Sequence, residues 1–321
     1  MIVTRLWHAR ELSTVAILAL EVIVFAWYLW PDAGRPHPFF NASNGLLILK
    51  YSSIYGIAAI GAAIVIISGG IDLAPGAVIA LTSVITGYLF VERGWPLAPS
   101  VVAGLMTGVA AGLVSSWLIV RVGLPPFIAT LGVMGIARGV AFIITEARYY
   151  DLSRSIPPGS RVVGLPIDWI APVVMVGAAV VFQLLMKRFQ WGRAVFAIGG
   201  NETAAVFSGI AVGRAKASVY VVAGLLASAS GIVLAIAQGQ GKADLATGYE
   251  LDIIASAVVG GASLAGGRGS VVGAVLGALV FGVLRNALPQ IPGATFYDRL
   301  IVGLVVIVIV VLDQLLVRAE R

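Results

Sequence analysis

The chain has 321 residues, of which 60% are hydrophobic and 11% charged, and its mean hydropathy is +1.01. No soluble core needs so much apolar surface, so the composition predicts an all-α polytopic membrane protein. The sequence contains no cysteine and only two histidines, His8 and His37, which excludes disulfides, thiolate catalysis and HExxH-type zinc sites. The net charge of +6 is modest, and its distribution indicates membrane topology rather than nucleic-acid binding.

One short stretch resembles the end of a phosphate-binding loop. Gly241 and Lys242 match that motif, but Ile236 stands where its first glycine should be and Ala243 replaces the serine or threonine. We therefore expect a chain that does not hydrolyse ATP, is not itself an enzyme, and carries no cofactor or metal of its own.

About ten apolar runs are long enough to be transmembrane helices, and together they predict one transmembrane domain over 1–321. The predicted spans are residues 12–30, 47–69, 73–91, 98–120, 126–145, 167–186, 216–238, 250–266, 270–288 and 297–316. The first follows Arg5 and Arg10 as a signal peptide would, but it ends in aromatic residues and lacks a small-residue cleavage site. It is interpreted as a retained helix. The spans at 73–91 and 250–266 begin near acidic residues, which leaves simple, broken and re-entrant helices as alternatives.

The connection at 187–216 is the most basic part of the chain. It carries Lys187, Arg188, Arg193, Arg214 and Lys216, which predicts a cytoplasmic location. Ten crossings then place both termini in the cytoplasm, and they place the connection at 146–166 on the opposite side.

A short helix is predicted inside this basic connection. Asn201 can cap residues 202–207, with Glu202 in the first turn, and Ser208 and Gly209 can end the helix. A capped helix with an apolar side at the membrane surface is suited to docking into a groove of a partner, which we expect to be an ATPase subunit.

Two parts of the sequence repeat each other weakly. Residues 69–74 and 248–253 each open an apolar run that is followed by a helix with glycines spaced by four. These glycines are Gly104, Gly108 and Gly112 in the first copy and Gly273 and Gly277 in the second. Five helices in each half, at about 1–150 and 167–321, predict an inverted repeat. The glycine faces predict close packing within one subunit or, alternatively, a subunit interface.

Polar groups within membrane helices each need an explanation. Asp72 can cap the following helix or line a solute path, and Arg138 must face protein or water. Glu250 and Asp252 lie at a predicted helix start, where the helix dipole favours them. The candidate residues for a translocation path or gate are Asp72, Thr82, Thr86, Gln238, Glu250, Asp252 and Asn286.

Four ordered motifs resemble a known family. They are SGGIDL at 68–73, PPFIATLG at 125–132, GGNETAA at 199–205 with SGI at 208–210, and GYELD at 248–252 with GGAS at 260–263 and GGRG at 266–269. The chain from about Tyr51 onward is similar to the ribose/xylose/arabinose-type permeases of bacterial ABC sugar importers. Ala74 and Pro75 depart from the pattern, which more often has a Ser-Val pair there.

The resemblance implies an inner-membrane permease that imports a monosaccharide, either a pentose, a hexose or a related polyol. It implies a homodimer or a heterodimer with a related permease, a separate ATPase that binds ATP and Mg, and a periplasmic sugar-binding protein. The large cytoplasmic loop of such permeases contacts the ATPase. This role is carried onto Gly200, Asn201, Glu202, Ala205, Ser208 and Gly209.

Two other classes of protein are alternatives. An ion-coupled secondary sugar transporter would need buried carboxylates or histidines as ion sites, and the predicted helix interiors contain almost none. A non-transporting membrane scaffold is opposed only by the broken-helix signals. Because a binding protein would capture the sugar, an importer permease needs only a weakly polar path, which agrees with this sequence.

Overall fold

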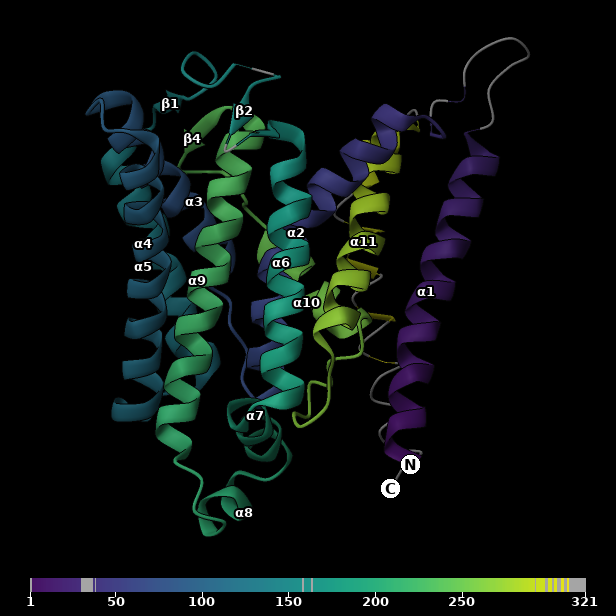
Figure 1. The fold of residues 1–321 in the computed structure, drawn as a ribbon, viewed down its shortest axis with the longest axis vertical. Coiled ribbons are helices and arrows are strands. Elements are labelled where there is room, and N and C mark those ends of the chain that lie inside the picture. Colours follow the sequence, from purple (N-terminus) through teal and green to yellow (C-terminus); the bar gives the residue numbers. More distant parts are fainter. Residues whose placement is uncertain are drawn as a thin grey trace.

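The computed structural model describes residues 2–29, 37, 39–157, 159–162, 164–291, 293–297, 300, 301, 303, 304, 307, 308 and 311. Long helices lie side by side, and short strands lie at one end of the bundle (Figure 1). The predicted all-α polytopic architecture is confirmed.

Eight helical segments in the described part of the chain are long and apolar enough to cross a membrane. They contain α1 (Ile2–Tyr28), α2 (Ala42–Ile67), α3 (Pro75–Gly87), α4 (Leu97–Trp117), α5 (Pro126–Thr145), α6 (Ile167–Arg188), α9 (Val212–Gln238) and α11 (Val271–Ala287). Helices α3 and α4 each continue into a wider π-helical turn, at Tyr88–Glu92 and Leu118–Val122. Short 3₁₀ turns follow α11 at Leu288–Gln290 and Ala294–Tyr297.

The described residues also form three shorter helices, α7 (Gln190–Gly200), α8 (Glu202–Phe207) and α10 (Tyr249–Val259). Helix α10 replaces the predicted span at 250–266. Its 11 residues are about 17 Å long at 1.5 Å per residue, which is little more than half of a hydrocarbon core of about 30 Å. The alternative that residues 250–266 form a simple transmembrane helix was therefore wrong. Most of the predicted span 297–316 lies outside the described residues, so the count of ten stays a prediction. Arg318 and Arg321, which the predicted topology places in the cytoplasm, also lie outside them.

Helices α2 and α9 form the centre of the bundle and pack against each other. Helix α4 packs along α9, and α11 packs along α2. In the same way, α3 contacts α9 and α10 contacts α2. Helix α2 of the first half is thus covered by helices of the second half, and α9 of the second half is covered mainly by helices of the first. This exchange is the arrangement that an inverted repeat would produce, and it supports that prediction.

The glycine face of α4 packs inside the chain. A side chain at Gly108 would overlap the carbonyl oxygen of Gly224, and one at Gly112 would meet the main chain at Tyr220. Gly273 and Gly277 pack in the same way, against the carbonyl oxygens of Gly260 and Ser256. These contacts follow the intrachain alternative for the glycine faces.

The connection at 146–166 contains ordered strands. Strand β1 (Tyr149–Asp151) pairs antiparallel with β4 (Gln240–Lys242), and β2 (Arg161–Val162) pairs with β3 (Leu165–Pro166). The amides of Leu152 and Ser153 also donate to the carbonyl oxygen of Gly239, at 2.8 and 3.1 Å. These strands form the strand end of the bundle, and α8 lies at the other end, which is also the end where α1 begins (Figure 1).

Candidate functional site

Helix α8 has the local structure that its sequence predicts. The side-chain oxygen of Asn201 accepts a hydrogen bond from the amide of Ala204 at 2.9 Å, which caps the first turn. The amide and the hydroxyl of Ser208 both donate to the carbonyl oxygen of Ala204, and Gly209 follows with a φ of +78°. A left-handed residue at this position favours glycine and ends the helix.

The free face of α8 is apolar. Phe207 is 86% exposed and Val206 is 55% exposed, whereas Ala205 is only 3% exposed and packs inward. Gly200 and Gly209 have open space where a side chain would stand. Neither Phe207 nor Val206 was among the predicted coupling residues, although apolar residues that end a short helix in a polar loop were a usable signal.

An ion pair holds α8 against the next long helix. Lys216 on α9 donates to Glu202 at 2.7 Å. Glu202 therefore has a partner within the chain, and its side chain orients α8 in addition to facing solvent.

Helix α7 was not predicted, because residues 187–216 were interpreted as a connection with a single short helix, at 202–207. The helix forms because apolar residues recur on one side of it, and Val195 and Ile198 are buried there. The indole nitrogen of Trp191 donates to the hydroxyl of Ser218 on α9 at 2.7 Å. Helix α7 is thus fixed to the bundle rather than free in solvent.

Three stretches of main chain meet where α7 ends. The amide of Gly267 donates to the carbonyl oxygen of Ile67, the last residue of α2, at 2.8 Å. A side chain at Gly199 would overlap that same carbonyl oxygen, and Gly266 and Gly267 both have positive φ. We call this contact of Ile67, Gly199, Gly266 and Gly267 the glycine seam. It joins α7 to the connection that leads into α3 and to the connection that leaves α10.

The two helices that follow extended segments begin next to each other. A side chain at Gly76, in the first turn of α3, would overlap Glu250 Oε2 in the first turn of α10. Asp72 Oδ1 accepts a hydrogen bond from the amide of Ala74 at 2.9 Å. This bond fixes the turn before α3 rather than capping an amide inside the helix, which corrects the predicted capping role in detail. The positive ends of two helix dipoles therefore lie next to each other within the bundle.

Arg138 on α5 supports the segment that precedes α10. Its Nη1 donates to the carbonyl oxygens of Ala243 and Leu245, at 2.6 and 2.7 Å. The prediction that this charge faces protein is confirmed.

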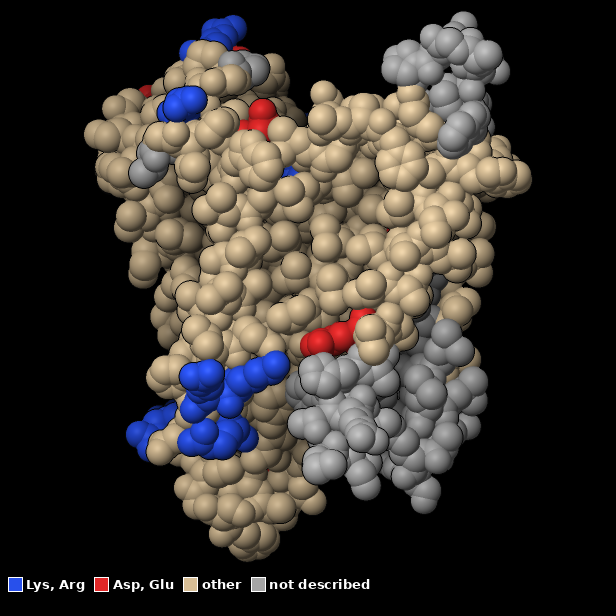
Figure 2. Space-filling model, turned by 45° about the vertical axis from the view of Figure 1, so that its right-hand side comes forward, with Lys and Arg blue, Asp and Glu red and all other residues tan. Residues whose placement is uncertain are grey.

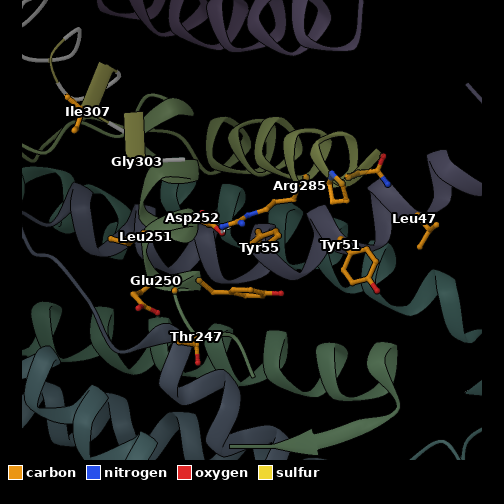
Figure 3. A pocket seen from close by; sticks show the side chains of 15 residues that line it. Leu47, Tyr51, Tyr55, Thr247, Glu250, Leu251, Asp252, Arg285, Gly303 and Ile307 are labelled. Carbon is orange, nitrogen blue, oxygen red and sulfur yellow. Dashed lines mark hydrogen bonds and ion pairs between the residues drawn. The ribbon is translucent and has the colours of Figure 1, made fainter. Parts of the chain in front are cut away.

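A cavity of about 970 Å³ lies between α2, α10 and α11 (Figure 3). Its lining is made of Leu47, Tyr51, Tyr55, Thr247, Gly248, Tyr249, Glu250, Leu251, Asp252, Gly282, Arg285, Asn286, Pro289, Gly303 and Ile307. We call it the tyrosine cavity. The first turns of α2 and the last turns of α11 line it, so it lies toward the strand end of the bundle (Figure 1).

A buried ion pair lies on the wall of the tyrosine cavity. Asp252 Oδ2 accepts hydrogen bonds from Arg285 Nη2 at 2.7 Å and from Nε at 3.2 Å. The Asp252 side chain is fully buried and that of Arg285 is 25% exposed. Nearby, Asn286 donates to Asn44 Oδ1 at 2.9 Å and accepts a hydrogen bond from Gln290 at 3.0 Å.

The structure brings together three of the seven predicted path residues, namely Glu250, Asp252 and Asn286, in this cavity. The other four lie elsewhere. Asp72 lies in the turn before α3, Thr82 bonds Thr107 between α3 and α4 at 2.8 Å, Thr86 is buried beside Gly104, and Gln238 accepts a 3.4 Å hydrogen bond from Gln240 at the end of α9. The prediction missed Tyr51, Tyr55 and Arg285, because apolar periodicity does not tell which helix face borders a cavity.

Comparison with known proteins identifies the family. The family described as "Branched-chain amino acid transport system / permease component" matches residues 44–310. No solved structure matches the chain.

Several curated relatives match over nearly their full length. The ribose import permease protein RbsC of Escherichia coli (strain K12) is 34% identical, over 97% of this chain and 95% of the relative. RbsC of Bacillus subtilis (strain 168) is 34% identical over 86% of both chains, and the D-allose transport system permease protein AlsC of Escherichia coli is 31% identical over 95% and 91%. The chain therefore belongs to this family of bacterial ATP-binding-cassette importer permeases, as a multi-pass subunit of the inner membrane.

Proposed function

We propose that this permease imports a monosaccharide, either a pentose, a hexose or a related polyol. Relatives of the chain are named as ribose, allose and fructose importers. Energy is supplied by a separate ATPase subunit that binds ATP and Mg, and a periplasmic sugar-binding protein delivers the solute. We further propose that two permeases, identical or related, form the membrane unit together with surrounding lipid.

The α8 end is proposed to be cytoplasmic. Lys and Arg side chains gather near this end of the molecule (Figure 2). Lys187 and Arg188 in the last turn of α6 contribute to this charge, as does Arg193 on α7. By the positive-inside rule, residues 187–216 are then the cytoplasmic coupling loop and 146–166 the periplasmic loop, with the first turn of α1 inside.

The exposed apolar face of α8 is the observation that carries the docking proposal. Asn201, Ser208 and Gly209 fix the ends of the helix, Glu202 orients it, and Gly200 and Gly209 leave room for a partner to approach. Ala205 packs α8 onto its support. Phe207 then projects into a groove of the ATPase, as an amphipathic helix does in helix-in-groove recognition.

The glycine seam supports a route for the movement of a docked α8. Because Gly199 and Gly267 contact Ile67 through main-chain atoms, no flexible side chain lies between α7 and the ends of α2 and of the α10 connection. Displacement of α7 therefore reaches the segment that leads into α3 and the segment that leaves α10. We propose that this changes which end of the path is open, with Glu250, Asp252 and Asn286 on the path. The remaining predicted residues hold the surrounding helices in position; they are Asp72, Thr82, Thr86 and Gln238.

A charge on the free face of α8 should abolish docking. Phe207→Glu places a carboxylate where an apolar contact is needed, so the ATPase should no longer co-purify and uptake should fall by at least about tenfold, the effect of losing about 1.4 kcal/mol. The measurement is co-purification from gently solubilised membranes of the native host, combined with sugar uptake by cells.

Phe296→Glu is the matched control, because Phe296 is 91% exposed and follows α11 at the strand end. This control variant should retain the ATPase. Normal co-purification and uptake by Phe207→Glu would refute the docking proposal. If the unaltered chain purified alone and moved sugar in vesicles without ATP, it would instead be an ion-coupled secondary transporter.

A methyl group at the glycine seam should uncouple ATP hydrolysis from transport. Gly199→Ala must separate α7 from Ile67, because the added carbon overlaps the carbonyl oxygen there. We expect the ATPase to remain bound and active, while sugar moved per ATP falls severalfold in reconstituted vesicles. Gly135→Ala on α5 is the control, since Gly135 has open space where the methyl group would stand and lies away from the seam. Equal coupling ratios in the two variants would contradict the proposed route.

A further inference from the structure

We propose that the tyrosine cavity is a binding station for an uncharged monosaccharide, where the solute stops between the binding protein and the cytoplasm. This inference rests on the proposed function and assigns it a site that includes Tyr51, Tyr55, Tyr249 and Arg285. The proposal is based on the combination of aromatic and hydrogen-bonding groups in one cavity within an otherwise apolar bundle.

The aromatic groups suit a sugar ring. The rings of Tyr55 and Tyr249 lie 4.7 Å apart, tilted by 42°, on facing helices α2 and α10. Tyr51 lies one turn before Tyr55 on α2, so both side chains border the same cavity (Figure 3). Tyrosine offers an apolar face for the C–H groups of a sugar and a hydroxyl for its hydrogen bonds.

The charges of the lining favour a neutral solute. Asp252 forms an ion pair with Arg285 at 2.7 Å. Two of the three charged side chains in the lining thus neutralise each other, so the net charge offered to an ion is small. Arg285 N–H groups and the Asn286 amide can instead hydrogen-bond to sugar hydroxyls.

The volume and position favour brief occupancy. At about 970 Å³ the cavity lies at the upper end of the range for small-molecule pockets, so a single monosaccharide leaves room for water. A loosely held solute can leave again, which a transport path requires. The cavity also lies toward the strand end, which is the proposed side of sugar delivery.

Protection of an engineered thiol tests occupancy directly, because the natural chain has no cysteine. Leu251 lines the cavity and is 55% exposed, so Leu251→Cys should react with a maleimide in the purified complex in lipid nanodiscs. D-ribose, D-allose and D-fructose are added separately. At least one should slow labelling about twofold at a concentration equal to its dissociation constant.

Two comparisons make the result specific. Leu165 on β3 lies outside the cavity and is 40% exposed. The variant Leu165→Cys should therefore react with the maleimide at the same rate with or without sugar. D-ribose 5-phosphate should give no protection of Leu251→Cys. If none of the three sugars slows labelling at Leu251→Cys, or if the phosphate protects equally well, the station is refuted. ATPase binding and import would be unaffected by that outcome, so the proposed function is tested separately.

A second variant tests the role of the cavity in transport. Tyr51→Leu should lower sugar moved per ATP about fivefold, the size of one lost hydrogen bond, while ATP hydrolysis stimulated by the binding protein stays unchanged. Tyr28→Leu on α1, where Tyr28 is 60% exposed, is the matched control and should leave both rates unchanged. Unaltered coupling in Tyr51→Leu would contradict the station. Loss of ATP dependence in the unaltered complex would instead refute the importer itself.

Discussion

Replacing Gly108 by leucine should remove most of the folded protein from the membrane. Helix α4 approaches α9 so closely that even one carbon at this position overlaps the carbonyl oxygen of Gly224 and lies 2.5 Å from the Ser228 side chain. Ser228 also donates to the Leu105 carbonyl oxygen at 3.2 Å, so a separation of the helices breaks that bond. Overpacking a core site lowers the free energy of unfolding by about 1–3 kcal/mol. We expect the upper end of that range here, because the added carbon meets backbone atoms of the opposing helix.

Gly135→Leu on α5 is the control for this prediction, because Gly135 has open space and lies in a spanning helix of similar composition. The measurement is the yield of monodisperse protein in detergent and its thermal unfolding midpoint. A Gly108→Leu protein with the yield and midpoint of the Gly135→Leu protein would show that α4 and α9 do not pack in this way.

Removing one partner of the Asp252–Arg285 pair should have the second large effect. Arg285→Met leaves the fully buried carboxylate of Asp252 without its guanidinium, which typically costs about 3–5 kcal/mol. The double variant Asp252→Asn/Arg285→Met removes both charges and should recover most of that loss. Denaturant unfolding of the four proteins gives the coupling free energy of the pair.

The Lys50–Asp168 pair provides a comparison. It has the same 2.7 Å separation, but the Asp168 side chain is 43% exposed. Water can therefore solvate the Asp168 carboxylate when Lys50→Met removes the ammonium group. Its loss should be clearly smaller. Single-variant losses that simply add in the double variant at 252 and 285 would contradict a coupled buried pair.

The parts of the structure that were predictable from sequence depend on local rules. Asn201, Ser208 and Gly209 cap and end α8 through bonds within a few residues, so residue types at those positions suffice. The long helices follow from apolar runs in the same way, and the acidic start at Glu250 indicated that this span was unusual.

The parts that were not predictable depend on contacts between distant residues. Arg285 pairs with Asp252 across 33 positions, and nothing near either residue specifies the other. Tyr51 and Tyr55 lie in a helix that is apolar on all sides, so the sequence does not distinguish its cavity face from its packed faces. Helix α7 was missed for the same reason, because Gly199 lies against the main chain of Ile67, which is distant in the sequence.

The ladder between β1 and β4 makes residues 152–239 a closed loop, because the strands on either side of that segment are hydrogen-bonded to each other. Helix α6 begins near this tied base and α9 ends at it, and α7 and α8 connect the two helices at the opposite end (Figure 1). The ladder therefore ties the two ends of this segment at the strand end, whereas the Trp191–Ser218 bond, the Lys216–Glu202 pair and the glycine seam hold it at the other end. Movement of α8 then requires changes at those three contacts and little displacement at the strands.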